Sequence, residues 1–281
     1  MKIRYLGTGA SEGIPAVFCH CPICRAARRD GGRNIRTRAQ AIIDGRLLLD
    51  FGPDTFMHSL QYGIDLADIR DCLITHAHPD HLYVEDVMAR RRSRANLDLG
   101  TPCLNLYGGQ GVWEALNPDE QGFVTKDRSV RFTMLEGCKR VKIGGYTVVP
   151  LQAVHSTVSP YVYVIQDAVT SILYGHDTDF LEEETWASLE REKFRFDLVS
   201  LDCTEGKKHI DYPGHMNFER IGMFCKRMRE LGLIDPNTTV VANHISHNGL
   251  VGHDEAVKIG DEMGVVVAYD GLELRIKGAL R

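Results

Sequence analysis

The sequence has few of the features that mark membrane, secreted or fibrous proteins. Its 281 residues contain no run of about 18 apolar residues, so no transmembrane helix and no membrane partner are expected. The first residues form too short and too broken an apolar stretch for a secretory signal peptide, which predicts a cytoplasmic protein. Linkers rich in Pro, Gly or Ser, low-complexity tracts and convincing internal repeats are also missing. We therefore expect a globular protein that buries a core of its own.

Neither sign of charge dominates the chain. Lys and Arg number 33 against 38 Asp and Glu, a formal charge of −5, which argues against generic nucleic-acid binding. Arginines nevertheless gather at 25–38 and at 90–94. We interpret them as solvated faces and local ion pairs. The alternative is an electropositive rim that steers a phosphate ester toward a site.

Cysteine is too scarce for a disulfide scaffold, with eight in 281 residues. Cys19, Cys21 and Cys24 have the spacing C-x-C-x-x-C, which in a reducing compartment indicates a metal site before a disulfide. Structural zinc is usually four-coordinate, so one ligand is missing from this loop. The other five cysteines are interpreted as small core residues: Cys72, Cys103, Cys138, Cys203 and Cys225.

Short apolar runs alternate with amphipathic stretches along the whole chain. Strands are expected at 2–6, 40–43, 46–50, 71–75, 103–107, 130–135, 146–153, 161–166, 171–175, 197–201, 238–242, 265–269 and 273–276. Helices are expected at 82–94, 181–191, 218–231 and 254–263. Asp44-Gly45 and Asp270-Gly271 indicate hairpin turns. Polar residues from both halves follow strand ends, so we predict one layered α/β domain over 1–281, with the Cys loop at 13–38 inside it.

The most informative segment is T-H-A-H-P-D-H at 75–81, directly after an apolar strand. Alternate residues of an extended backbone face the same way, so His76 and His78 can bind one ion together. Asp80 and His81 follow as the chain turns toward a helix, and they can bind a second ion nearby. Imidazole and carboxylate ligands suit Zn, Mn, Fe or Ni.

Two ions need more ligands than this segment holds. His155, Asp177 and His244 each follow a later predicted strand. Functional residues of α/β folds gather after strand ends, so we expect these three to join the cluster.

Together these residues resemble the metallo-β-lactamase superfamily. The resemblance rests on H-A-H-P-D-H at 76–81, on the three later ligands and on the preceding L-D-F-G turn at 49–52. It implies an αββα sandwich, two mixed β-sheets flanked by helices, and a two-metal hydrolase. The implied ligands are His76, His78 and His155 for one ion, Asp80, His81 and His244 for the other, and Asp177 between the two. Asp50 would orient a ligand histidine, or else be a plain turn residue.

Four segments resemble a narrower group, the PhnP-type phosphodiesterases. They are G-T-G-A with G-I-P at 7–15, the three-Cys loop, L-D-C at 201–203, and N-H-I-S-H at 243–247. The resemblance implies that His247 completes a structural zinc site. It assigns His215 and Asp80 to catalysis, with His215 as the general acid, although a surface-loop histidine is the alternative. The remaining histidines are interpreted as ordinary ones: His20, His58, His176, His209 and His253.

The resemblance implies a phosphoric diester hydrolase with two catalytic divalent ions, Zn or Mn, and one structural Zn. Its substrate would be a small phosphate ester, a cyclic ribose phosphate or cyclic nucleotide, attacked by a metal-bound hydroxide; relatives are often homodimers. One alternative is a tRNA-processing nuclease related to ribonuclease Z, for which 90–94 is the sole candidate arm. The other is a non-hydrolytic binding or carrier protein like the pyrroloquinoline-quinone biosynthesis relatives, against which the complete ligand set argues.

Overall fold

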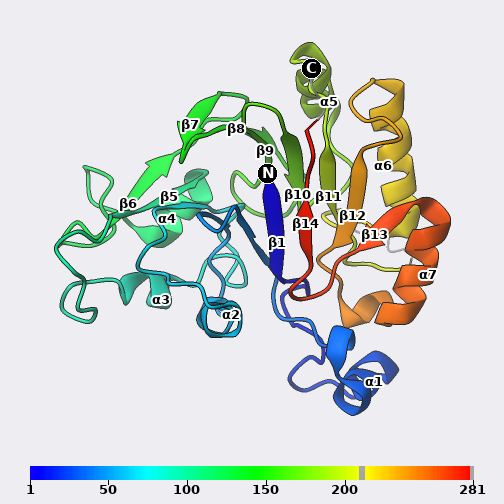
Figure 1. Cartoon of the computed structure of the whole chain (residues 1–281), viewed down its shortest axis with the longest axis horizontal. Helices are drawn as coiled ribbons and strands as arrows, with labels where there is room; N and C mark the ends of the chain where they lie inside the picture. Colours follow the sequence, from blue (N-terminus) through cyan, green and yellow to red (C-terminus); the bar gives the residue numbers. More distant parts are fainter. Residues whose placement is uncertain (209–212, 279–281) are drawn as a thin grey trace.

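Two mixed β-sheets packed face to face form the centre of the protein, and helices cover both outer faces (Figure 1). The computed structural model describes residues 1–208 and 213–278. The α/β class and the αββα sandwich predicted from the sequence are confirmed. Among the described residues, no helix combines the length and the apolarity needed to cross a membrane.

Each sheet has seven strands, and both follow one pairing scheme. The first contains, in spatial order, β14 (Glu273–Arg275), β1 (Lys2–Gly7), β2 (Gln40–Ile43), β3 (Leu47–Leu49), β4 (Asp71–Leu73), β5 (Leu104–Gly108) and β6 (Val130–Met134). The second contains β7 (Val141–Ile143), β8 (Tyr146–Gln152), β9 (Tyr161–Gln166), β10 (Ser171–Gly175), β11 (Leu198–Asp202), β12 (Thr239–Asn243) and β13 (Val265–Val267).

In both sheets, three antiparallel pairs are followed by three parallel pairs. The two sheets thus repeat one topology, with β14 from the end of the described chain completing the first sheet, although the sequence shows no convincing repeat. The loops that follow the parallel strands of each sheet lie on one side, because parallel strands all end in the same direction. A site can form where these loops meet.

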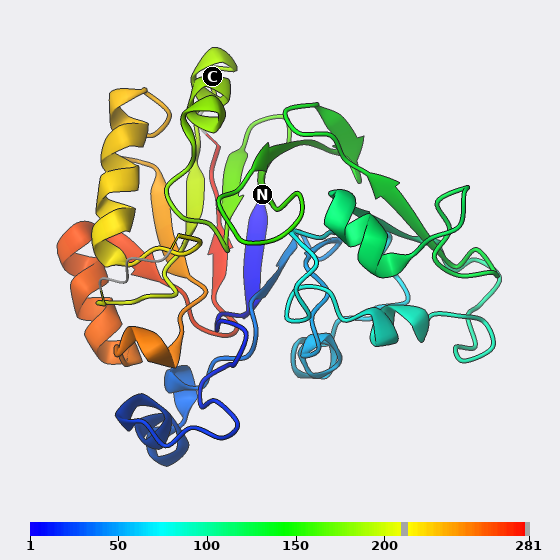
Figure 2. The ribbon, with the colours of Figure 1, turned by 180° about the vertical axis from the view of Figure 1, so that it is seen from behind.

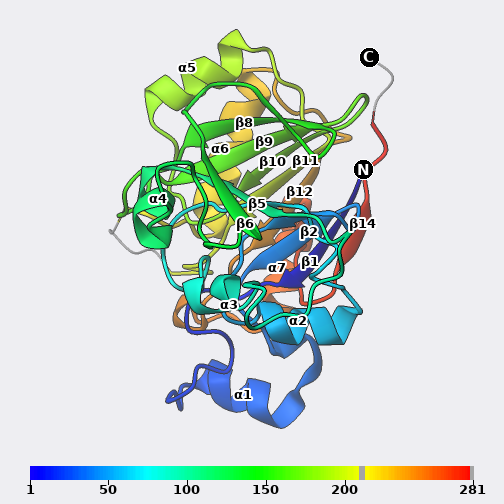
Figure 3. The ribbon, with the colours of Figure 1, turned by 90° about the vertical axis from the view of Figure 1, so that its left-hand side faces the viewer.

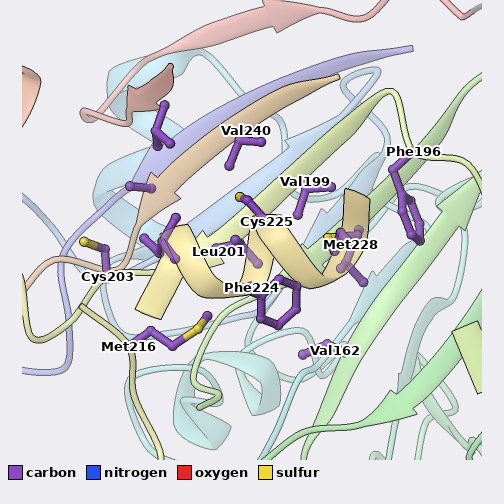
Figure 4. Close-up of a cluster of buried hydrophobic side chains, with 14 of the residues drawn as sticks. Val162, Phe196, Val199, Leu201, Cys203, Met216, Phe224, Cys225, Met228 and Val240 are labelled. Atoms are coloured by element: carbon purple, nitrogen blue, oxygen red, sulfur yellow. The ribbon is translucent and has the colours of Figure 1, made fainter. Parts of the chain in front are cut away.

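Three apolar clusters hold the layers together. The central one joins both sheets, with Tyr5 from β1 packed among residues such as Tyr163 and Tyr174. A second lies between the second sheet and α5 (Glu183–Arg191), α6 (Phe218–Glu230) and α7 (His253–Met263). Figure 4 shows Phe224 and Met228 of α6 directed at the strands of this sheet.

The third cluster covers the outer face of the first sheet. It packs that sheet against α2 (Thr55–Tyr62), α3 (Val84–Met88) and α4 (Gln110–Leu116), on the opposite side of the molecule from α5 to α7 (Figure 2). One helix, α1 (Pro22–Asp30), lies apart from both sheets and projects from one end of the molecule (Figure 3).

The expected helix at 82–94 is too long. The helix α3 ends at Met88, because the guanidinium of Arg90 donates to the backbone carbonyls of Leu66, Ala67 and Pro102 and ties the chain to those loops. The strand β7 and the helices α1, α2 and α4 were not expected, since each is short or lacks a clear apolar periodicity.

The expected hairpin at 265–276 is wrong, whereas the turn at Asp44-Gly45 does join β2 to β3. The strand β13 pairs with β12 in the second sheet, and β14 pairs with β1 in the first. Asp270 anchors this crossing, because its carboxylate accepts hydrogen bonds from Thr8 Oγ1 at 2.6 Å and from the N–H and Oγ1 of Thr37 at 2.7 Å each.

The prediction of five core cysteines holds in part. Cys72, Cys203 and Cys225 are buried, while Cys103 is half-buried. Cys138 is exposed, because it occupies a turn with a φ of 63° beyond the end of β6.

Asp270→Ala should lower the free energy of unfolding by about 2–4 kcal/mol, because three donors lose a charged acceptor. Chemical denaturation measures this difference. The matched control is Asp98→Ala, in an exposed loop, which should change stability by less than about 0.5 kcal/mol. Equal effects of the two substitutions would show that Asp270 does not hold the crossing between sheets.

Candidate metal centre

The first group of candidate ligands consists of three histidines from two segments. His76 and His78 follow β4, and His155 follows β8. The Nδ1 atom of His78 lies 2.9 Å from His76 Nε2 and 3.1 Å from His155 Nε2. Two nitrogens that ligate one zinc at ordinary bond lengths in a tetrahedron lie about 3.3 Å apart. The three ring nitrogens therefore surround a space of the right size for one ion.

The second group contains Asp80, His81, Asp177 and His244, whose ligand atoms lie within 4.8 Å of one another. His81 Nε2 is 2.6 Å from Asp177 Oδ2, and His244 Nε2 is 3.1 Å from the same oxygen. The other oxygen, Asp177 Oδ1, lies 4.0 Å from Nε2 of His155 in the first group. All seven residues predicted from the sequence thus come together, with Asp177 between the two groups.

Three buried atoms of the second group fit a bound cation. His81 Nε2, Asp177 Oδ2 and His244 Nε2 have no hydrogen-bond partner among the described residues. Their contacts with one another do not meet hydrogen-bond geometry, so the three atoms converge without satisfying one another. Buried polar atoms are normally paired, and leaving them unpaired is costly. A divalent ion at this point would satisfy all three.

The pKa values of the histidines in the cluster shift in opposite directions. Burial alone would lower the pKa of His81, but Asp80 and Asp177 outweigh it and raise that pKa well above its ordinary value. Burial likewise opposes, and Asp177 drives, the raised pKa of His244. Burial lowers the pKa of His76 well below the ordinary value. Negative charge is thus concentrated around Asp177, where a cation would replace the protons.

Two further buried carboxylates orient the ligands. Asp50, which follows β3, lies with Oδ2 2.8 Å from His81 Nδ1, and its Oδ1 accepts from the N–H of Thr75 at 2.7 Å. Asp202, the last residue of β11, accepts from the N–H of Asp177 at 3.1 Å. Such partners fix the orientation of metal ligands.

Thr204 extends the role of Asp202 to a ligand histidine. Its hydroxyl lies 3.0 Å from Asp202 Oδ2 and 2.8 Å from His244 Nδ1. The roles of Asp202 and Thr204 were not expected from the sequence. The sequence does contain a signal for Asp202, which is the one that also marks Asp50: a carboxylate directly at the end of a buried strand.

His215 lies beside the cluster, just before α6. Its Nδ1 is 3.0 Å from Asp202 Oδ2 and 3.5 Å from Asp177 Oδ1. Burial alone would lower the pKa of His215, but Asp202 raises it to about 9. The same side chain lines a cavity of about 430 Å³ together with His78, Asp80 and other members of the cluster.

The three cysteines meet the histidine that the resemblance indicates. Cys19 Sγ and Cys21 Sγ lie 3.6 and 3.5 Å from His247 Nδ1, and Cys24 completes the group. Sulfur and nitrogen ligands of one tetrahedral zinc are about 3.6 Å apart, so the donor set fits this metal. Cys21 also caps the N-terminus of α1, where burial would raise its pKa but hydrogen bonds led by the Cys24 N–H lower it to about 6.

Other histidines make structural contacts. His58 lies 2.7 Å from Thr37 Oγ1, and His176 lies 2.7 Å from Ser200 Oγ. His253 contacts the buried Arg36, while His209 lies outside the described residues. No arginine or lysine occurs among the described residues that line the cavity, but Arg38 of the first arginine stretch donates to the backbone carbonyl of the lining residue Ser11 at 3.0 Å and is paired with Asp54.

The sandwich and its cluster at one edge define the metallo-β-lactamase class. A model of the Beta-lactamase superfamily domain matches residues 45–245, more than half of the chain, so this protein belongs to that family. The octanoyltransferase of Porphyromonas gingivalis is 32% identical over 97% of this chain. The chain covers 51% of that relative, about half of its length.

Solved structures share the fold. A diphosphatase from the PhnP family matches with a TM-score of 0.73 and 22% identity, over 100% of this chain and 99% of its own. The Zn²⁺-bound PqqB of Methylobacterium extorquens matches with a TM-score of 0.75 and 18% identity, over 98% of this chain and 100% of its own.

Asp177→Ala should remove one or both ions from the histidine–aspartate cluster and abolish nearly all hydrolysis, because adjacent cations need an anion between them. Elemental analysis of purified protein counts the ions, and circular dichroism verifies folding. The control Asp261→Ala removes an exposed carboxylate on α7 and should keep full metal content. A folded Asp177→Ala variant with its full set of ions would refute the assignment.

Cys21→Ser should release one zinc per chain and lower thermal stability, because a closed metal site contributes to folding directly. Cys138→Ser, at an exposed cysteine outside the group, serves as the control and should change neither quantity. Metal analysis with a melting curve measures both. If Cys21→Ser keeps its zinc and its melting temperature, these thiols are ordinary loop residues.

Proposed function

We propose that this protein hydrolyses small phosphate diesters with two divalent ions, Zn or Mn, bound by the histidine–aspartate cluster. One observation carries the proposal: His215 lines the same cavity as the cluster and is held there by Asp202. A group that can give a proton therefore faces the space where candidate ligands converge. Membership of the family supports hydrolysis in general.

Each side chain of the site has a separate role in the proposed reaction. Divalent ions, when bound, acidify a water molecule and neutralise charge on phosphoryl oxygens. His78, Asp80 and His155 line the cavity and define where a phosphate group lies. Asp202 holds Nδ1 of His215, which leaves Nε2 to donate a proton to the departing oxygen. Asp50 and Thr204 keep His81 and His244 in fixed orientations.

One of the comparisons supports hydrolysis at phosphorus. The structural match described as a diphosphatase shares this type of reaction with a phosphodiesterase, although a diphosphate is an anhydride and a diester is not. The curated relative named octanoyltransferase is about twice as long as this chain. The half that this chain does not match can account for the acyl transfer in its name. The match to PqqB keeps a binding or carrier protein as the alternative.

Metal analysis combined with activity screening distinguishes these functions. The phosphodiesterase proposal expects about three ions per chain and turnover of bis-p-nitrophenyl phosphate and 2′,3′-cyclic nucleotides. A metal-loaded protein that hydrolyses neither compound would favour the carrier. Activity confined to precursor tRNA would favour the nuclease. The described residues that line the cavity include no arginine to bind a tRNA backbone, which argues against that function.

His215→Ala should keep full metal content, because the proposed acid contacts the leaving group and not the ions. The rate on a substrate with a ribose leaving oxygen should fall by about 10²–10⁴-fold. With p-nitrophenolate the loss should be much smaller, since that group departs without a proton. His215 also lies within 4.8 Å of ligand atoms of Asp177, Asp202 and His244. Loss of an ion in His215→Ala, or equal loss on both substrates, would therefore make it a ligand or a structural residue.

A further inference from the structure

Glu12 places a fixed carboxylate on the wall of the same cavity. The segment that carries it is joined to the loop of His244 by a β-bridge between Gly9 and Ile245. Glu12 lines the cavity together with His215 and His244, and 28% of its side chain is exposed. Its carboxylate therefore faces the space that a substrate would occupy.

Both oxygens of this carboxylate are held. Oε1 accepts hydrogen bonds from Ser246 Oγ and, at 3.4 Å, from Asn248 Nδ2. Oε2 accepts from Ser11 Oγ at 3.1 Å. His247 Nε2, on the candidate zinc ligand, lies 3.4 Å from Oε1. The charge is thus held in place from two segments of the chain.

Acidic side chains predominate around the cavity. Among the described lining residues, Glu12, Asp80, Asp177 and Glu205 are acidic, and the basic side chains are histidines, of which His215 is paired with Asp202. Asp80 and Asp177 face the proposed ions, which would neutralise them. Glu12 lies against serine and asparagine side chains and against Nε2 of His247, which belongs to the separate cysteine group, so the proposed catalytic ions do not neutralise its charge.

We propose that Glu12 is a specificity-determining residue, which favours diesters whose scissile phosphate is their sole charge and disfavours substrates that carry another phosphate. The inference rests on the proposed phosphodiesterase function and concerns the same site. A second phosphate in this cavity would meet a fixed carboxylate, while the cationic side chain that lines the cavity, His215, is already paired with Asp202. Like charges brought into one partly desolvated space repel each other, and salt screens the repulsion.

The experiment compares two substrates that differ by one remote phosphate. Adenosine 2′,3′-cyclic phosphate and its 5′-phosphorylated form share the scissile group, and kcat/KM is measured for both. The wild type should prefer the compound without the 5′-phosphate. Glu12→Gln should reduce that preference by about three- to tenfold, and the reduction should shrink at high salt.

Two variants separate charge from structure. Glu12→Asp keeps the charge and should keep the preference of the wild type. Glu120→Gln removes an exposed carboxylate outside the cavity and should leave both the activity and the preference unchanged. A merely structural role for Glu12 would alter both substrates equally and without salt dependence.

The outcomes distinguish this inference from the function on which it rests. If the wild type hydrolyses no phosphate diester, the proposed function fails. If it hydrolyses both compounds and Glu12→Gln leaves their ratio unchanged, the function stands and the role of Glu12 is refuted. A wild-type preference for the 5′-phosphorylated compound would also refute it.

Discussion

The carboxylate of Asp177 has its two oxygens directed to two different groups of histidines, and the arrangement of the whole site depends on it. Burial would raise the pKa of this group, yet the imidazoles of His244 and His81 keep that pKa well below its ordinary value. A buried anion needs cations or donors around it. The protein supplies imidazoles and a hydrogen bond between Asp202 and the Asp177 N–H, and leaves the ligand atoms converging on points where ions fit.

The duplicated topology explains how these residues meet. The strands β10, β11 and β12 are parallel neighbours, so Asp177, Asp202 and His244 emerge side by side at their ends. The first sheet contributes Asp50 and the segment 75–81 in the same manner. Asp50, Asp177 and His244 all have positive φ, a conformation uncommon outside glycine that Asp and His adopt more readily than most residues. The chain accepts local strain there to turn side chains toward the cluster, as is common at functional sites.

One short loop links the two candidate metal sites. His244 belongs to the histidine–aspartate cluster, and His247, three positions later, belongs to the cysteine group. Ser246, between them, donates to Glu12 on the cavity wall. Zinc bound at His247 would thus restrain the loop that carries His244 and that holds Glu12 in place. This restraint gives a physical reason for a structural metal at that position.

Much of this site could be predicted from the sequence where the relation between residues is local. The H-x-H spacing places His76 and His78 in one loop after β4, although that loop bends at 77–78 and is not the extended segment that was expected, and C-x-C-x-x-C places three thiols in one turn. The bounds of β9 and β10 were predicted to the residue, because their buried apolar runs are separated by the tight turn at 167–170. The resemblance to a known family supplied the distant ligands, and their binding of metal stays a prediction.

Tertiary structure alone decided the rest, because those interactions join residues that no local pattern relates. Arg90 ends α3 by bonding carbonyls of two other loops, which periodicity along one helix cannot show. Asp270-Gly271 has the composition of a hairpin turn, but Thr8 and Thr37 hold it as a crossing between sheets. The position of Glu12 on the cavity wall likewise depends on contacts with a loop more than 230 residues away. Sequence determines which chemistry is present at strand ends, and the pairing of distant strands determines which of those ends face each other.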